Sequence, residues 1–272
     1  MDAAHTSHGV SLLSRVAVVT DGGDAPGDPD VADQSSWPAT SPLALQGIRA
    51  GYGRIEVLHG VDLTLRRGEI VALLGPNGAG KTTTLGVMSG LIRPSQGCLH
   101  VQGRHVNGAS AETLARAGVC HVREGRSVFP NLSVADNLLV VPSSGADDER
   151  TTEVAFALFP SLKDRRNQLA GTLSGGEKQM LSLACGLGTD PAVLLIDELS
   201  MGLAPIIVEQ LYAAVAEVAR SGVATLVVEQ FATLGLKYSS RAVVMAHGTV
   251  IFEGASAAAA EAIHHAYLGS GQ

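Results

Sequence analysis

A glycine-rich loop at residues 75–82, Gly-Pro-Asn-Gly-Ala-Gly-Lys-Thr, carries the clearest chemistry in this sequence. It matches the pattern of a phosphate-binding loop, in which backbone N–H groups and a helix N-terminus bind anionic phosphate. Lys81 would reach the β- and γ-phosphates of a nucleotide, and the Thr82 hydroxyl would bind Mg²⁺. The nucleotide-binding residues predicted in this loop are Gly75, Pro76, Asn77, Gly78, Ala79, Gly80, Lys81, Thr82 and Thr83.

The flanking sequence supports this interpretation. An apolar run at 70–74 precedes the loop and a predicted helix at 82–88 follows it, which is the strand–loop–helix order that the motif requires. A glycine-rich turn with a surface lysine is the alternative, and it leaves this order unexplained. The sequence therefore predicts binding of a nucleoside triphosphate.

Two adjacent acids, Asp197 and Glu198, follow a second apolar run at 193–196. Open α/β sheets bind their ligands at the C-terminal ends of the strands. Asp197 would bind Mg²⁺, and Glu198 would polarise or orient the attacking water. The alternative is an ordinary polar strand end, but a phosphate loop upstream favours the catalytic interpretation.

The elements that must position these residues are visible as hydrophobic patterns. Unbroken apolar runs are typical of parallel strands covered on both faces, whereas alternation is typical of half-buried antiparallel strands. A stretch at about 131–173 has helical periodicity, with helices expected at 134–141 and 147–158. The prediction is an α/β fold: a P-loop NTPase core with a mainly parallel sheet, an antiparallel β subdomain and a helical insertion subdomain. Parallel strands are expected at 70–74, 193–196, 224–228 and 242–245, and antiparallel strands at 43–48 and 60–65.

Length and composition limit the function classes. The 272 residues suffice for one large α/β domain, and the net charge of −7 argues against a broad nucleic-acid-binding face. Three cysteines at positions 98, 120 and 185 have no metal-binding spacing and favour a reducing cytosol. We find neither an apolar run long enough to span a bilayer nor a secretion signal at the first residues. Residues 1–41 are rich in glycine, proline and acid, which predicts a disordered extension before a domain at 42–272.

A third motif, Leu-Ser-Gly-Gly-Glu at 173–177, identifies a family. It resembles the signature motif of the ABC-transporter ATPases, and it lies between the phosphate loop and Asp197, as in that family. A serine-capped helix with a glycine-rich turn is the alternative for this motif alone. The resemblance implies that two ATP molecules are sandwiched between two subunits. The residues expected to contact the ATP held by the opposite subunit are Ser174, Gly175, Gly176 and Glu177.

The resemblance covers residues 43–269 and implies roles for three further residues. Tyr52 occupies the place of the aromatic residue that stacks on adenine, with a buried sheet tyrosine as the alternative. Glu124 occupies the place of the Q-loop glutamine, which contacts nucleotide-bound Mg²⁺. Gln230 occupies the place of the switch histidine and is expected to act in catalysis with Lys81 and Glu198. A polar residue that only ends a strand is the alternative for Gln230.

The combination of Glu-Gly-Arg, Val-Phe-Pro, Gly-Leu-Ala-Pro and Val-Glu-Gln is similar to the ATP-binding subunits of branched-chain amino acid importers, of the LivF type. Three residues depart from the family pattern: Arg123 and Leu199 replace prolines, and Met201 replaces a leucine. None of them removes a phosphate-binding, metal-binding or water-orienting group, so activity is expected to survive.

The resemblance implies an ATPase that energises solute import from the cytoplasmic face of the membrane. Its expected cofactors are ATP and Mg²⁺. Its expected partners are a second ATPase subunit, integral membrane permeases and, indirectly, an extracytoplasmic solute-binding protein, with no nucleic acid. The alternatives are a urea or amide importer, a nucleotide-gated protein with negligible turnover, and an ABC ATPase acting on ribosomes or DNA.

Overall fold

The computed structural model describes residues 41–123, 128–140 and 148–268. Its main sheet has six strands among these residues, in the order β10-β9-β3-β8-β7-β6. Neighbouring strands pair in parallel except β10 and β9, which are antiparallel. The strands are β3 (Ile70–Leu74), β6 (Val119–Val122), β7 (Val193–Asp197), β8 (Ala224–Val228), β9 (Arg241–Ala246) and β10 (Thr249–Ala255).

The predicted parallel strands are confirmed. The runs at 70–74 and 224–228 match β3 and β8 residue for residue, and every residue of both strands is buried. The run at 242–245 lies within β9, which is parallel to β3 but antiparallel to β10. Sequence analysis missed β6 and β10, because β6 is short and β10 has no fully buried residue.

A second sheet of four antiparallel strands, in the order β2-β1-β4-β5, forms the predicted β subdomain. Both predicted strands of this sheet exist, but they are longer than the alternation indicated. Register shifts break the pairing of β1 with β2, and Gly47 and Gly60 adopt positive φ angles. A bulge of this kind reverses the inward–outward order and conceals the rest of a strand. The strands are β1 (Leu43–Tyr52), β2 (Ile55–Leu65), β4 (Gln96–Val101) and β5 (Arg104–His105).

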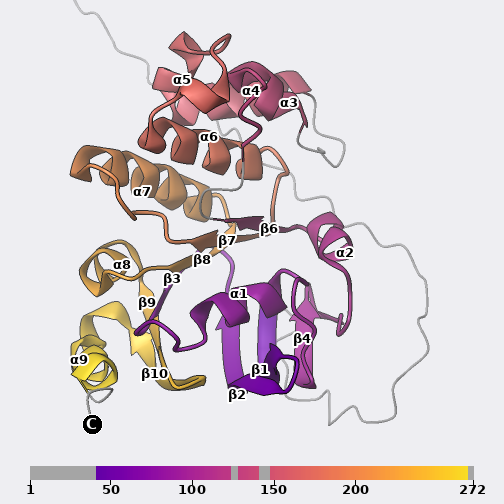
Figure 1. Ribbon diagram of the computed structural model, residues 1–272, viewed down its shortest axis with the longest axis vertical. Helices are drawn as coiled ribbons and strands as arrows, with labels where there is room; N and C mark the ends of the chain where they lie inside the picture. The colour runs from indigo at the N-terminus through magenta and orange to yellow at the C-terminus, as the bar shows by residue number, and fades with distance from the viewer. Residues whose placement is uncertain (1–40, 124–127, 141–147, 269–272) are drawn as a thin grey trace, which may run out of the picture. The chain divides into compact units, whose positions relative to one another are not determined.

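Helix α1 (Lys81–Met88) lies between the two sheets (Figure 1). One hydrophobic cluster joins its Leu85, Val87 and Met88 to residues of β1, β2, β3 and β8. This packing holds the N-terminus of α1 directly after β3, where the predicted phosphate loop lies. The predicted helix at 82–88 is confirmed.

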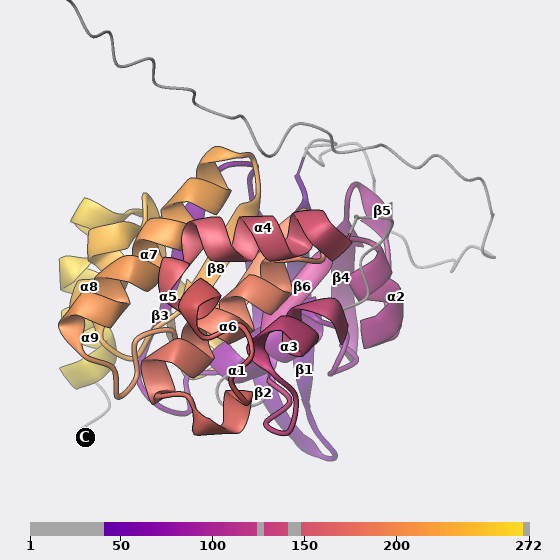
Figure 2. The same ribbon diagram turned by 90° about the horizontal axis from the view of Figure 1, so that it is seen from above.

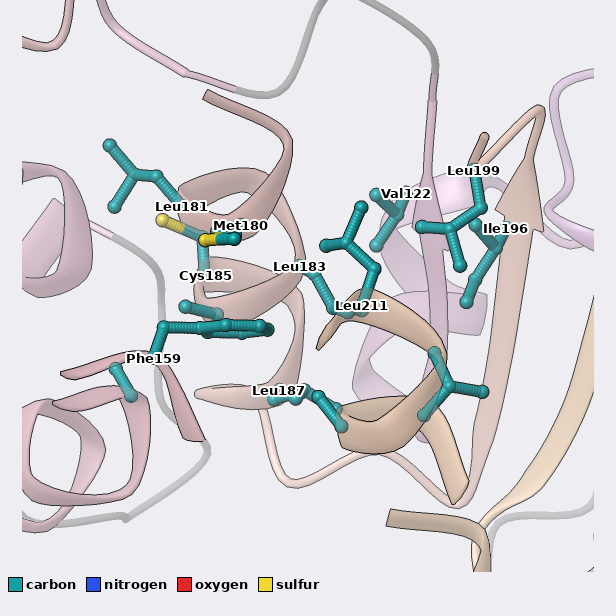
Figure 3. Close-up of a cluster of buried hydrophobic side chains, with 14 of the residues drawn as sticks. Val122, Phe159, Met180, Leu181, Leu183, Cys185, Leu187, Ile196, Leu199 and Leu211 are labelled. Carbon is teal, nitrogen blue, oxygen red and sulfur yellow. The ribbon is translucent and has the colours of Figure 1, made fainter. Parts of the chain in front are cut away.

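The helical subdomain packs on α6 (Gly175–Leu187), which in turn covers the other face of the six-stranded sheet (Figures 1 and 2). Figure 3 shows Phe159 on one side of α6 and Val122, Ile196 and Leu199 on the other. The two helices expected at 134–141 and 147–158 are confirmed over their described residues. The elements of the subdomain are α3 (Val134–Val140), α4 (Asp148–Leu158), α5 (Pro160–Asp164) and the 3₁₀-helix η2 (Ala170–Thr172).

Further helices complete the described chain, and sequence analysis did not predict them. One of them, α7, buries Val208, Leu211, Val215 and Val218, a helical spacing that the sequence already contained. No helix in the described part of the chain combines the length and apolarity needed to cross a membrane. The additional helices are α2 (Ala111–Arg116), α7 (Pro205–Arg220), α8 (Ala232–Tyr238), η3 (Ser256–Ala258) and α9 (Ala260–Leu268).

Candidate functional site

The predicted phosphate loop is the turn between β3 and α1, and its shape depends on glycine. Gly80 is the N-cap of α1 with φ 103°, and a Cβ there would lie 2.7 Å from Leu58 Cδ2. No side chain caps α1 and its first turn has no acid. Because the first N–H groups of a helix have no intrahelical partner, they are available to an anion. Asn77, Gly78 and Thr82 are exposed along this loop, whereas Ala79 and Thr83 are buried.

The Lys81 side chain folds back over the loop. Its ammonium group donates hydrogen bonds to the carbonyl oxygens of Gly75 (2.7 Å) and Pro76 (3.0 Å), and only 7% of the residue is exposed. Burial lowers the pKa of Lys81, and the nearby carboxylates of Glu198 and Asp197 act in the opposite direction. The fold therefore brings the loop lysine and both predicted acids together.

The backbone at Glu198 is in an uncommon conformation. Asp197 is the last residue of β7, and Glu198 follows it with φ 49°, in the left-handed region. Such backbone persists in a non-glycine residue only where surrounding contacts hold it. Here the Glu198 N–H donates to the carbonyl oxygen of Val228 at 3.0 Å, and the side chain of Leu199 is 0% exposed.

Leu199 is one of the three residues that depart from the family pattern, and it stands where the family has a proline. A proline would hold this turn by its ring, whereas Leu199 holds it by packing in the cluster between α6 and the sheet (Figure 3). The adjacent carboxylates thus keep a defined position without the proline.

A buried carboxylate that sequence analysis missed lies beside this turn. Glu229 is 1% exposed and accepts hydrogen bonds from the Ser200 hydroxyl and the Tyr212 hydroxyl, both at 2.7 Å. Burial raises its pKa, and the two hydrogen bonds oppose that shift. Glu229 thereby connects the end of β8 to the loop after Asp197-Glu198. An acid directly after the apolar run at 224–228 was the available signal, but only the next residue was assigned.

The remaining predicted residues are distributed as follows. Gln230 is exposed, directly after Glu229. Tyr52 ends β1 and is 56% exposed, which argues against the buried sheet tyrosine and leaves its ring free to stack on a base. Glu124 lies outside the described residues, as do residues 1–40 of the predicted extension, so those expectations stay predictions.

The signature residues form the N-terminus of α6. Ser174 caps the helix and Glu177 reaches back to it, with the Ser174 N–H donating to the Glu177 carboxylate at 2.9 Å. This hydrogen bond lowers the pKa of Glu177, and Arg165 forms an ion pair with it at 2.7 Å. Gly176 lies so close to α7 that a Cβ would be 2.7 Å from Ile207 Cγ2. Ser174 and Gly175 are exposed.

Within one chain, the two predicted phosphate sites do not meet. Helix α1 packs on one face of the six-stranded sheet and α6 packs on the other (Figure 1). The phosphate loop, Asp197 and Glu198 form one site at the C-terminal edge of the sheet. The turn at 174–177 is a separate surface.

The candidate site contains oxygen atoms that could bind Mg²⁺ together with a nucleotide. No group of three histidine, cysteine, aspartate or glutamate side chains in the described ranges could hold a metal by itself. Mg²⁺ does not need such a group, because it is usually bound by one or two protein oxygens together with substrate phosphates. The exposed Thr82 and the half-buried Asp197 supply oxygens of that kind.

The fold and the β3–α1 loop define a nucleotide-binding protein of the P-loop class, and a family model described as ABC transporter matches residues 58–200. The chain belongs to the ABC transporter family, as an ATP-binding cassette of the ATP-hydrolysing type. It is 38% identical to the high-affinity branched-chain amino acid transport ATP-binding protein BraG of Pseudomonas aeruginosa, over 84% of this chain and 99% of that protein.

Two other relatives differ from each other in the transport system that they serve. The chain is 32% identical to a probable branched-chain amino acid transport ATP-binding protein LivF of Archaeoglobus fulgidus, over 76% of this chain and 89% of that protein. It is 33% identical to a lipopolysaccharide export system ATP-binding protein LptB of Acidithiobacillus ferridurans, over 78% of this chain and 89% of that protein.

Solved structures agree with the fold. The ADP conformation of an ATP-binding cassette of an ABC transporter has a TM-score of 0.73 at 23% identity, over 84% of this chain and 99% of that one. A dimeric post-hydrolysis cassette bound to ADP and Pi has a TM-score of 0.70 at 21% identity, over 79% of this chain and 98% of that one. The predicted fold class is confirmed.

Proposed function

We propose that this chain is the ATP-hydrolysing subunit of an importer of branched-chain amino acids. The similarity to BraG carries this proposal, because it is higher than that to the lipopolysaccharide export protein and extends over nearly all of BraG. The motifs at 124–126, 128–130 and 228–230 support the same branch.

The first step in the proposed mechanism is a movement of Lys81. Its ammonium group exchanges the carbonyl oxygens of Gly75 and Pro76 for the β- and γ-phosphates of ATP. The exchange replaces neutral acceptors with charged ones, so the hydrogen bonds become stronger. The uncapped N-terminus of α1 adds backbone N–H groups to the same phosphates.

Metal binding and activation of the attacking water are the remaining steps, and they involve Thr82, Asp197 and Glu198. Thr82 and Asp197 would hold Mg²⁺, which when bound neutralises charge on the β- and γ-phosphates. Glu198 orients the attacking water and accepts its proton. Its left-handed backbone, held by the hydrogen bond to Val228, keeps the carboxylate at the strand end. Gln230, on the neighbouring loop, would contact the γ-phosphate.

A second ATPase subunit completes the site in this proposal. The turn at 174–177 of one copy, or of a sister chain, would contact the γ-phosphate held by Lys81 of the other. The placement of these two groups on opposite faces of one sheet supports this arrangement, because a single chain cannot bring them together. Hydrolysis removes the shared γ-phosphate, so the subunits separate and move the membrane partners.

The helical subdomain offers a surface for a membrane permease. Phe129, Leu139, Val140 and Leu169 are large apolar side chains exposed there. The buried amide of Asn137 holds the loop of Phe129, since it accepts from the Phe129 N–H (2.7 Å) and donates to the Phe129 carbonyl oxygen (3.0 Å). Exposed apolar residues on an ordered loop are typical of a protein interface. Through this contact the subunit would lie on the cytoplasmic face of the membrane.

Solute uptake tests the proposal. The chain is produced with its neighbouring permease genes in cells lacking their own branched-chain amino acid importers, and uptake of labelled leucine and of urea is compared. We expect leucine uptake that requires Glu198. Uptake of urea but not of leucine would contradict the proposed substrate and favour a urea importer. ATP binding without turnover in the assembled complex would favour a nucleotide-gated protein.

A further inference from the structure

Helix α9 (Ala260–Leu268) packs beside the phosphate loop, although nearly 200 residues of chain separate them. Ala259 and Ala266 are buried in a cluster with Leu74 at the end of β3, and Tyr267 packs against that cluster. The ring of Tyr267 is therefore fixed next to the point where β3 becomes the phosphate loop.

The Tyr267 hydroxyl lies between two loops of the site. Its oxygen is 3.0 Å from the carbonyl oxygen of Gly75 and 3.2 Å from that of Gln230. These loops follow β3 and β8, which are neighbours in the sheet with Leu73 paired to Val228. Burial raises the pKa of Tyr267, so its hydroxyl stays protonated and can donate at neutral pH. The single proton of this hydroxyl is thus shared between the start of the phosphate loop and the loop of Gln230, and it can turn towards either carbonyl oxygen.

The Gly75 carbonyl has a second donor, the ammonium group of Lys81 at 2.7 Å. When Lys81 turns to a phosphate, this buried carbonyl loses its charged partner, and a buried acceptor without a partner is costly. Tyr267 supplies a donor that remains. When its proton turns fully to the Gly75 carbonyl, the Gln230 carbonyl loses this donor, and this exchange links the two loops.

We propose that Tyr267 is a positioning residue that favours release of Lys81 to the γ-phosphate and couples that step to the Gln230 loop. This proposal rests on the proposed ATPase function and adds a C-terminal residue to its control. It predicts that the hydroxyl matters more for ATP than for ADP, because Lys81 would contact both the β- and γ-phosphates of ATP but only the β-phosphate of ADP. A hydroxyl that only anchored α9 would affect both nucleotides equally.

The test compares Tyr267→Phe with Tyr238→Phe in the full chain. Tyr238 stacks on Tyr212 within the fold, so its variant controls for loss of a tyrosine hydroxyl elsewhere. Kd is measured with fluorescent ATP and ADP analogues in Mg²⁺, and Tm is recorded for each variant. We expect Tyr267→Phe to raise the Kd for ATP about three- to tenfold, which is the size of one neutral hydrogen bond. The Kd for ADP should rise less than about twofold. Tyr238→Phe leaves the ratio of the two Kd values unchanged.

A double variant sharpens the test. In a Lys81→Ala background the Gly75 carbonyl has no lysine to release, so Tyr267→Phe should no longer change the ratio of ATP to ADP affinity. Equal weakening of ATP and ADP, wild-type affinity for both, or an undiminished effect without Lys81 would each overturn the proposal. The measurement needs no permease or solute, so an ATP-selective effect together with failed leucine uptake would support the role of Tyr267 and refute the proposed substrate.

Discussion

The N-termini of α1 and α6 are both predicted to bind phosphate, but they are built differently. That of α1 has a glycine at the N-cap, no capping side chain and no acid in its first turn. That of α6 is closed by its own residues, because Ser174 and Glu177 cap it and Arg165 pairs with Glu177. A ligand has to satisfy the N–H groups of the first helix, whereas two N–H groups of the second, those of Ser174 and Glu177, already have side-chain partners.

This difference supports the proposed site between two subunits. The carboxylate of Glu177 already lies at the positive end of the α6 dipole, which weakens that end as an independent anion site. The start of α1 has Lys81 and uncapped N–H groups and can bind phosphate within one chain. We infer that α6 adds only the exposed turn at Ser174 and Gly175 to a phosphate that another chain holds.

The largest expected effect comes from breaking the α1 site. Lys81→Ala should lower the ATPase rate by about 10³-fold, because it removes the charge that meets the phosphates. Binding of ATP by the isolated chain should weaken as well, as measured by nucleotide fluorescence. Lys163→Ala, an exposed lysine of α5, is the control. Normal turnover in Lys81→Ala would refute the assignment of the phosphate loop.

Removal of the proposed base should separate binding from hydrolysis. Glu198→Gln keeps the shape of the side chain but cannot accept a proton, so we expect turnover to fall by about 10²- to 10³-fold with ATP still bound. Light scattering should then detect an ATP-dependent dimer, with the sister subunit present if the pair is heteromeric. The exposed Glu217→Gln provides the matched comparison. A variant that remains monomeric in ATP would contradict the sandwich.

A change at the α6 turn should spare the isolated chain. Ser174→Arg places bulk at the exposed turn, so ATP affinity of the monomer should stay within about twofold while ATP-dependent dimerisation is lost. Ser110→Arg is a matched control, because Ser110 is the N-cap of α2 and loses a comparable cap.

Mixed dimers extend this test if the chain pairs with itself. A chain with Lys81→Ala and one with Ser174→Arg would together form one intact composite site, so activity should return on mixing. Two inactive proteins that stay inactive together, although they associate, would show that both groups act in the same chain.

The smallest expected effect concerns the buried Glu229. Tyr212→Phe removes one of its donors and should lower the free energy of unfolding by about 1–3 kcal/mol. A carboxyl whose folded pKa is raised binds more protons in the native state than in the unfolded state. Its contribution to stability is therefore lost as the pH rises above 4.5 towards the folded pKa. Loss of a donor raises that pKa further.

The loss caused by Tyr212→Phe should accordingly be larger at pH 7.5 than at pH 5.5 in urea unfolding. The double variant with Glu229→Gln has no carboxyl at this position, so the difference between the two pH values should disappear. A pH-independent loss in Tyr212→Phe would mean that only packing of the ring had changed.

Local patterns predicted the strands around the site well. The apolar run that became β3 lies between Glu69 and Gly75, and the run that became β8 ends before Glu229, so these limits were readable. The antiparallel strands were underestimated, because bulges near Gly47 and Gly60 change the side-chain alternation. The candidate roles of Tyr52 and Gln230 came from resemblance, and the structure adds that both residues are exposed.

The sequence by itself determined the local features of this protein, namely the glycine loop at 75–80, the uncapped start of α1 and the self-capped start of α6. These features depend on residues within a few positions of one another, so a short motif contains all of their information. Only the tertiary structure decided which distant groups meet. Ser200 reaches Glu229 across 29 residues and Tyr267 reaches Gly75 across 192, and such hydrogen bonds depend on how the layers pack rather than on any local spacing.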